Sequence, residues 1–168
     1  MEEIDIQSRA VLLAEKLIRV LSSHSQSLAL AESCTGGLVA DFLTCVPGAS
    51  EVFWGSYVCY TPEAKISMLN LDRNRLERFG LVSRETVCDM AAGALERSGV
   101  NIAAAVTGLA GPEGDGSGIP VGTAWIAVAM KKKGIAGVSE YHFSGTRNEI
   151  RLQATMAVLE ALDKELII

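Results

Sequence analysis

The chain has 168 residues, which is enough for one compact domain and short for two, because domains cluster near roughly 100–150 residues. Hydrophobic residues make up 49% and charged residues 21% of the chain, so it can bury a core, and this excludes a largely disordered chain. The formal net charge of −5 offers no positive field to DNA or RNA, and we expect no nucleic-acid partner.

Apolar stretches such as residues 121–130 are much shorter than the roughly 20 residues that a membrane helix requires. The acidic start, Met1-Glu2-Glu3, is unlike a signal peptide. We therefore expect a cytoplasmic protein that has no membrane partner.

The cysteines and histidines show no metal-ligand spacing. There is no CxxC pair, and the chain has only two histidines, His24 and His142. We expect no metal site, and reduced thiols rather than disulfides, because a chain of this size with an ample core does not need them. The cysteines are Cys34, Cys45, Cys59 and Cys88.

The first half of the chain alternates helical and strand patterns. Residues 4–23 carry apolar side chains near the helical period and predict an amphipathic helix. Residues 27–32 predict a strand, residues 38–45 a helix after a glycine turn, and residues 52–60 a second strand. Thr61 as N-cap and Pro62 at the first helical position then predict a helix that has Lys65 in its first turns. The apolar residues of the first helix are Val11, Leu12, Leu17, Ile18 and Leu21.

The second half begins with a helix that Ser83 caps and Gly99 ends, followed by a strand at residues 102–107. Residues 108–120 contain five glycines and two prolines and predict a long loop, a kind of loop that is more often functional than idle. Residues 121–130 and 135–143 predict a β-hairpin, and residues 149–167 a closing helix. The inward residues are Val87, Met90, Ala91, Ala94 and Leu95 in the first of these helices, and Ile150, Ala154, Ala157, Val158, Ala161 and Leu162 in the last.

This order of elements favours a three-layer α/β/α sandwich with a mixed sheet. The chain shows no internal repeat and no stretch of linker composition. We therefore predict that residues 1–168 form a single domain.

Three glycine-bearing segments, residues 33–37, 107–111 and 144–147, follow predicted strands, where ligands of open α/β sheets collect. The backbone at Thr35, Gly36 and Gly37, and at Thr107 and Gly108, could bind a phosphate or an oxyanion. The helix dipole that begins near Gly37 would assist. The alternative is that these glycines only permit tight turns.

Ser33 after the first strand, with Tyr60 and Lys65 after the second, could form a serine nucleophile with a lysine base. The base requires a lowered pKa, which burial under the 108–120 loop and a positive neighbour, Arg147, would favour. Tyr60 or Arg147 could also stabilise developing negative charge. The alternative reading is a capping serine and a solvated surface lysine.

Several familiar signatures are absent. The chain has no GxxxxGKS/T phosphate loop, no GxSxG elbow and no SxxK starting at Ser33. The GxGxG run at residues 114–118 leads into a strand rather than a helix, so it lacks the dinucleotide-binding context. A serine triad would need His24 or His142, and we expect both to be peripheral to the glycine turns.

At these residues the sequence resembles the CinA C-terminal domain family, the nicotinamide mononucleotide deamidases. The resemblance covers nearly the whole chain and rests on six short sequence motifs that occur in the same order as in the family. They are AESCTGGL at 31–38, PGAS at 47–50, YTPEAK at 60–65, VTGLAGP at 106–112, PVGT at 120–123 and GTR at 145–147. The family usually has Ser-Asn where this chain has Thr61-Pro62, and Asp where it has Thr146.

The resemblance implies hydrolysis of nicotinamide mononucleotide to nicotinic acid mononucleotide and ammonia, with no metal and no cofactor. By position, Ser33 would be the nucleophile and Lys65 the base, with Tyr60 and Arg147 as supporting catalytic groups. Thr107 and Gly108 would line the same pocket, and Arg147 would hold either the phosphate or the oxyanion.

Longer members of the family carry an additional N-terminal domain associated with pyrophosphatase activity, which we do not expect from this chain. The rival hypothesis is a non-catalytic nucleotide-binding or protein-interaction module, linked to competence and DNA damage. We expect a homo-oligomer, with a dimer favoured.

Overall fold

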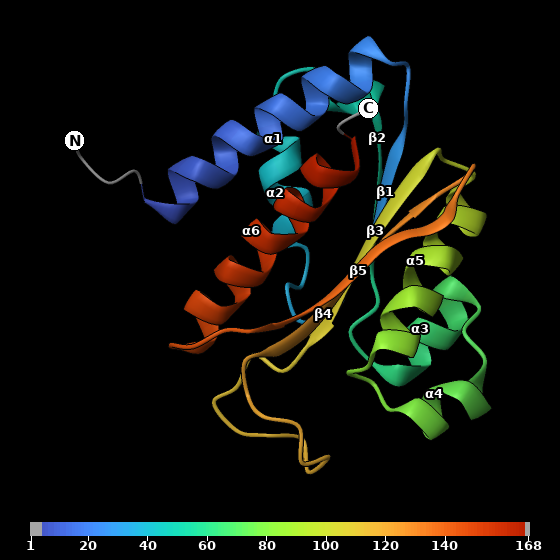
Figure 1. Cartoon of the computed structure of the whole chain (residues 1–168), viewed down its shortest axis with the longest axis vertical. Coiled ribbons are helices and arrows are strands. Elements are labelled where there is room, and N and C mark those ends of the chain that lie inside the picture. Colours follow the sequence, from blue (N-terminus) through green and yellow to red (C-terminus); the bar gives the residue numbers. More distant parts are fainter. Residues whose placement is uncertain (1–4, 167–168) are drawn as a thin grey trace.

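The computed structural model describes residues 5–166, which form one five-stranded sheet between two helical layers (Figure 1). The strands are β1 (Leu28–Glu32), β2 (Phe53–Val58), β3 (Ile102–Gly108), β4 (Thr123–Met130) and β5 (Gly134–His142). The helices are α1 (Ile6–Ser23), α2 (Leu38–Thr44), α3 (Pro62–Leu69), α4 (Arg73–Phe79), α5 (Arg84–Ser98) and α6 (Arg147–Leu166), with a 3₁₀ turn, η1 (Ala49–Glu51).

The sheet is mixed, with the order β2-β1-β3-β4-β5. β1 pairs in parallel with β2 and β3, while β4 is antiparallel to both β3 and β5. Strands β1, β2, β3 and β5 therefore point the same way, and their carboxyl ends meet at one edge of the sheet. The predicted three-layer α/β fold with a mixed sheet is confirmed.

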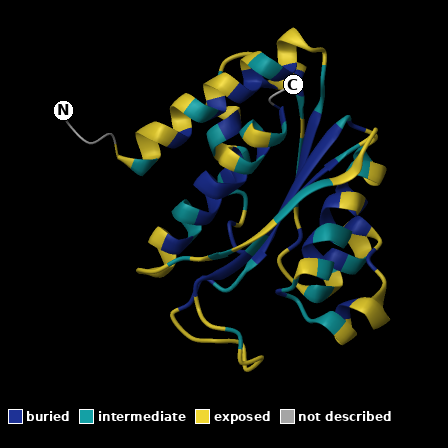
Figure 2. Ribbon diagram, viewed as in Figure 1, coloured by how far each residue is buried: buried dark blue, intermediate teal, exposed yellow. Residues whose placement is uncertain are grey.

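The two helical layers bury separate cores against opposite faces of the sheet (Figures 1 and 2). α1, α2 and α6 cover one face, over side chains such as Leu28, Leu30 and Ile126. α3, α4 and α5 cover the other, over Ala31, Ala103 and Ala127. The small side chains of the second face let α5 pack close to the strands. Gly93 of α5 instead marks a close contact with the end of α3, because an added Cβ would lie 2.5 Å from the Leu69 carbonyl oxygen.

Local capping signals explain where several helices begin and end. Thr61 Oγ1 accepts a hydrogen bond from Ala64 N (3.1 Å), and Ser83 Oγ accepts one from Thr86 N (3.1 Å). Gly99 adopts the left-handed conformation that ends α5. The predicted N-terminus of α3 and both termini of α5 are therefore confirmed.

Other details differ from the sequence-based expectations. Val11 and Leu12 are exposed, because the buried face of α1 begins with Ala10 and Ala14. Leu95 and Ala161 are only partly buried. α4 was not predicted, because its single buried residue, Leu76, gives no apolar stripe. Ile167, predicted to end the last helix, lies outside the described residues.

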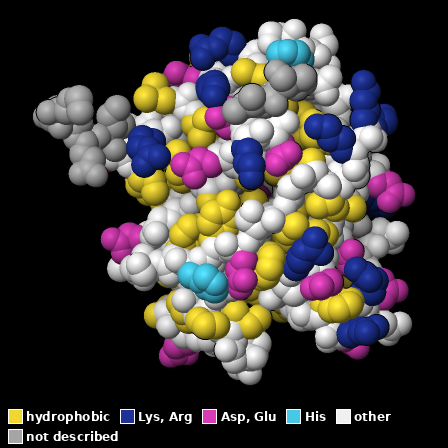
Figure 3. Space-filling model, viewed as in Figure 1, with side chains coloured by type: hydrophobic (Ala, Val, Ile, Leu, Met, Phe, Trp, Pro, Cys, Tyr) yellow, Lys and Arg dark blue, Asp and Glu magenta, His cyan; other side chains and the backbone are white. Residues whose placement is uncertain are grey.

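The surface visible in Figure 3 carries interspersed basic and acidic side chains, in keeping with 15 basic and 20 acidic residues in the chain. Within residues 5–166, no helix is long and apolar enough to cross a membrane.

Candidate active site

A cavity of about 210 Å³ lies at the carboxyl ends of the parallel strands. Ser33 follows β1, Tyr60 and Lys65 follow β2, and Arg147 opens α6 after β5. The long loop of residues 109–122 follows β3 and extends beyond the end of the sheet (Figure 1). The cavity is lined by Ser33, Cys34, Tyr60, Lys65, Leu81, Val82, Thr107, Gly108, Leu109, Ala110, Gly111, Glu113, Asp115 and Arg147.

Ser33 and Lys65 form a buried hydrogen-bonded pair in this cavity. Their side-chain atoms Oγ and Nζ are 2.9 Å apart, and the residues are 8% and 2% exposed. Lys65 Nζ also donates to the Cys59 carbonyl oxygen at 2.9 Å. Ser33 N donates to the Val106 carbonyl oxygen at 3.1 Å, which fixes the backbone of Ser33 against β3. This arrangement brings a hydroxyl within direct proton-transfer distance of an amine.

Burial lowers the pKa of Lys65 from its ordinary value, because the interior disfavours the ammonium form. The nearby Cys59 and Cys34 thiols act in the opposite direction and are the smaller effects. Arg147, which the sequence suggested as a positive neighbour, does not contribute to this shift. Its guanidinium is engaged elsewhere, and burial alone accounts for the direction of the shift.

Arg147 bridges two segments that are distant in the sequence. One guanidinium nitrogen donates to the Gly111 carbonyl oxygen at 2.6 Å, and the other donates to the Tyr60 hydroxyl at 2.6 Å. Tyr60 is 54% exposed, so its ring lies at the mouth of the cavity. The bridge holds the long loop and the end of β2 together beside the Ser33–Lys65 pair.

The five residues predicted to bind an anion separate into two groups. Thr107 and Gly108 line the cavity, and the Thr107 hydroxyl donates to the Leu81 carbonyl oxygen at 2.8 Å. Thr35, Gly36 and Gly37 are absent from the lining.

The turn at residues 35–37 instead makes internal contacts. The Thr35 hydroxyl and the Gly37 N–H donate to Glu32 Oε2 at 2.8 and 3.0 Å, and Gly36 N donates to the Ser33 carbonyl oxygen at 3.0 Å. Of the N–H groups that the sequence suggested for a substrate anion, Gly37 N therefore already has a carboxylate partner and Gly36 N a carbonyl partner.

Cys34 is a second nucleophilic group on the cavity wall. Burial raises the pKa of its thiol to about 11. The thiolate, which is the nucleophilic form, is therefore disfavoured at neutral pH. Ser33, which has a base candidate within hydrogen-bond distance, is better equipped for attack.

Several lining residues were missed in the sequence. Leu81 and Val82 lie between α4 and α5, in a stretch for which we predicted no element. Glu113 and Asp115 lie in the long loop, whose composition did mark it as a candidate. Glu32, which lies outside the lining, was assigned to a strand only. A charged residue within a buried apolar strand, directly before a glycine turn, is the signal that could have identified it.

The two histidines lie apart from this cavity and are exposed, which agrees with their predicted peripheral positions. Among the described residues, no three His, Cys, Asp or Glu side chains form a group that could hold a metal ion.

Comparison with known proteins identifies the class of this domain. Residues 11–166 match the family model described as the CinA C-terminal domain. The chain therefore belongs to the CinA C-terminal domain family.

Relatives and solved structures agree with this assignment. CinA-like proteins of Syntrophomonas wolfei and Chlorobium limicola are 42% and 44% identical over 87% and 88% of the chain. Each match covers 35% of the relative, so this chain spans about a third of the length of the curated relatives it matches.

The structure of the competence/damage inducible protein CihA from Agrobacterium tumefaciens is similar, with a TM-score of 0.90 at 37% identity, covering 98% of this chain and 99% of that one. A CinA superfamily protein from Klebsiella pneumoniae gives 0.89 at 31% identity, covering 94% and 97%.

Proposed function

We propose that this domain is a metal-independent amidohydrolase that converts nicotinamide mononucleotide to nicotinic acid mononucleotide and ammonia, in pyridine nucleotide salvage. The observation that carries the proposal is the buried pair of Ser33 Oγ and Lys65 Nζ, 2.9 Å apart on the wall of a cavity. The substrate comes from the family resemblance, and the pair supplies the chemistry that amide hydrolysis needs.

In the proposed reaction, Ser33 Oγ attacks the carboxamide carbon while its proton passes to neutral Lys65 Nζ. The tetrahedral intermediate collapses as the C–N bond breaks, and Lys65 returns the proton to the leaving nitrogen, which departs as ammonia. Water then attacks the acyl-serine ester with Lys65 again as base, and the acid product and free Ser33 hydroxyl are released.

One contact of Lys65 and its lowered pKa support its proposed role as base. The Cys59 carbonyl oxygen can accept an N–H from the neutral amine, which leaves the nitrogen lone pair for the Ser33 hydroxyl proton. The lowered pKa of Lys65 increases the fraction of neutral amine near neutral pH.

Tyr60 and Arg147 lie on the same cavity wall as polar and cationic groups. Two contacts use only part of the five N–H donors of the guanidinium. The remaining donors could serve the oxyanion of the intermediate or the phosphate of the nucleotide. Thr107 and Gly108 complete the proposed substrate pocket.

The experiment is incubation of the purified protein with nicotinamide mononucleotide, with ammonia and nicotinic acid mononucleotide measured together. We expect both products in equal amounts, and we expect Ser33→Ala to abolish turnover while the fold is kept. Ser67→Ala is the matched control, because Ser67 is exposed on α3, the helix that carries Lys65. Binding of the nucleotide without ammonia release would instead favour the rival, a non-catalytic nucleotide-binding module.

The proposal extends to location and assembly. A phosphorylated nucleotide substrate fits a cytoplasmic enzyme, and we expect a homodimer. Sedimentation of the purified chain measures its oligomeric state.

A further inference from the structure

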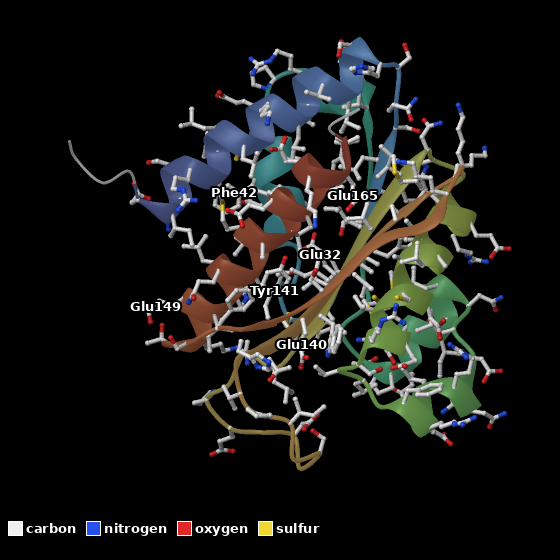
Figure 4. The ribbon with its side chains drawn as sticks, in the orientation of Figure 1. Glu32, Phe42, Glu140, Tyr141, Glu149 and Glu165 are labelled. Carbon is white, nitrogen blue, oxygen red and sulfur yellow. The ribbon has the colours of Figure 1, made fainter. Side chains whose placement is uncertain are left out.

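A buried carboxylate stands directly before the proposed nucleophile and has no part in the reaction described above. Glu32 is 1% exposed and accepts hydrogen bonds from five donors. Figure 4 shows it in the interior of the molecule, whereas Glu140 and Glu149 are exposed residues. Every contact of Glu32 Oε1 and Oε2 is with a donor, so both oxygens act as acceptors, as those of a carboxylate do.

The five donors come from three segments around Ser33. The Thr35 hydroxyl and Gly37 N belong to the turn that follows the nucleophile. Val39 N and Ala40 N, each 3.0 Å from a carboxylate oxygen, belong to the first turn of α2. The Ser56 hydroxyl, at 2.9 Å, belongs to β2. One side chain therefore fixes the turn, the helix and the neighbouring strand relative to one another.

The main chain of Glu32 reaches the base. Its carbonyl oxygen accepts a hydrogen bond from Cys59 N at 2.9 Å, and the Cys59 carbonyl oxygen accepts one from Lys65 Nζ at 2.9 Å. Lys65 Nζ contacts Ser33 Oγ in turn. The hydrogen bonds thus run from Glu32 to the lysine and back to the adjacent serine.

Consecutive residues at the end of β1 point to opposite faces of the sheet, because strand side chains alternate. Glu32 faces α2 with Leu28 and Leu30, while Ser33 faces Lys65 of α3. A small movement of the Glu32 side of the turn would therefore change the direction of the Ser33 hydroxyl on the other side.

We propose that Glu32 is a positioning residue for Ser33, whose carboxylate fixes the turn of residues 33–37 so that Ser33 Oγ stays in line with Lys65 Nζ. This inference rests on the proposed function, because the geometry it protects is that of the serine nucleophile. Glu32 touches neither the cavity nor the reacting atoms and acts only through its neighbour.

The hydrogen bonds require a glutamate at this position rather than a glutamine. Oε1 accepts from Ala40 N, and Oε2 accepts from Gly37 N and Val39 N. In either orientation of a glutamine amide, its NH₂ group would face at least one backbone N–H. Glu32→Gln therefore changes the turn while it keeps the size of the side chain.

The test compares the kinetics of Glu32→Gln with those of the wild-type protein, per folded molecule. We expect kcat to fall about tenfold to a hundredfold, the range expected for a nucleophile misplaced by up to about 1 Å. We expect KM to stay within a few-fold, since the cavity wall is intact, and the acidic limb of the pH–rate profile, set by Lys65, to stay in place. The labelling rate of Ser33 by a fluorophosphonate probe should fall in parallel with kcat.

Asp5→Asn is the matched control, because the Asp5 carboxylate also accepts from backbone N–H groups at a helix start, Gln7 N and Ser8 N, but lies at the exposed end of α1. It should leave both rates unchanged. A Glu32→Gln protein whose kcat and labelling rate match the wild type would overturn the proposal, as would equal losses in the Asp5→Asn control.

Two further variants keep the proposal testable if Glu32→Gln does not fold. Thr35→Val removes one donor to Glu32 at nearly constant volume, and Thr35→Ser keeps it. We expect the valine variant to lose rate and the serine variant to recover it, and equal rates for the two would contradict the role of Glu32.

The probe also separates the two proposals. A wild-type protein that labels at Ser33 but releases no ammonia would refute the substrate, while the labelling comparison still decides the role of Glu32. A wild-type Ser33 that resists the probe would refute both.

Discussion

Lys65→Arg tests whether the lysine transfers a proton or only supplies positive charge. Arginine keeps the charge and most of the length of lysine, but its pKa above ~12 prevents it from acting as a base near neutral pH. If Lys65 only attracted the substrate phosphate, the arginine variant should retain much of its kcat and change mainly KM.

The expected loss follows from the position of the amine. Lys65 Nζ is the side-chain nitrogen that contacts Ser33 Oγ, at 2.9 Å, and Lys65 is 2% exposed, so the enclosed site offers little room for solvent to replace it. A positioned general base contributes roughly 10²–10⁴-fold to a rate. We therefore expect kcat to fall by that factor, which corresponds to about 3–5 kcal/mol of the activation barrier.

The assay is ammonia release across pH, paired with calorimetric binding of nicotinamide mononucleotide. Because burial lowers the pKa of Lys65, the wild-type rate should rise with pH through a limb that lies below the ordinary lysine value of 10.5, as the neutral amine forms. That limb should vanish in Lys65→Arg while binding persists. Turnover within a few-fold of wild type, with the limb unchanged, would remove Lys65 from proton transfer and leave Tyr60 as the next candidate.

Two more predictions concern metals and the backbone. Treatment with EDTA should leave the rate of ammonia release unchanged, and a loss that one added divalent ion restores would refute the metal-independent mechanism. Gly122→Ala should lower the free energy of unfolding in urea by more than about 1 kcal/mol, because Gly122 has a φ of +93° and an added Cβ would collide with the Phe143 carbonyl oxygen. Gly114→Ala is its control, having open space around it, and an equal loss there would contradict this reasoning.

The elements that the sequence predicted well are those set by local signals. The start of α3 depends on Thr61 and Pro62, and both ends of α5 depend on Ser83 and Gly99, all within one turn of the boundary. α4 lacks such a pattern, because its place depends on one buried side chain, Leu76. On α1, alanine rather than valine or leucine forms the first part of the buried face, a choice made by packing against other elements.

The candidate site likewise contains residues that the sequence predicted and one contact that it did not. Their positions after predicted strands and the family motifs placed Ser33, Tyr60, Lys65 and Arg147 near one sheet edge, and the structure brings all four to one cavity. Their chemical roles remain predictions. The internal partner of the turn at residues 35–37 was missed, because glycine turns look the same whether a ligand or a protein carboxylate accepts their N–H groups, and only the charge of Glu32 within an apolar strand pointed to it.

The hydrogen bonds of the cavity connect residues far apart in the chain: Ser33 and Lys65 are 32 positions apart, Gly111 and Arg147 are 36 apart, and Tyr60 and Arg147 are 87 apart. Contacts of such long range form only after the loops between them have closed. The cavity should therefore be assembled late in folding, when α6 docks on the sheet and carries Arg147 to Tyr60. A partly folded chain would therefore contain Ser33 and Lys65 without the Arg147 bridge to Tyr60 and Gly111.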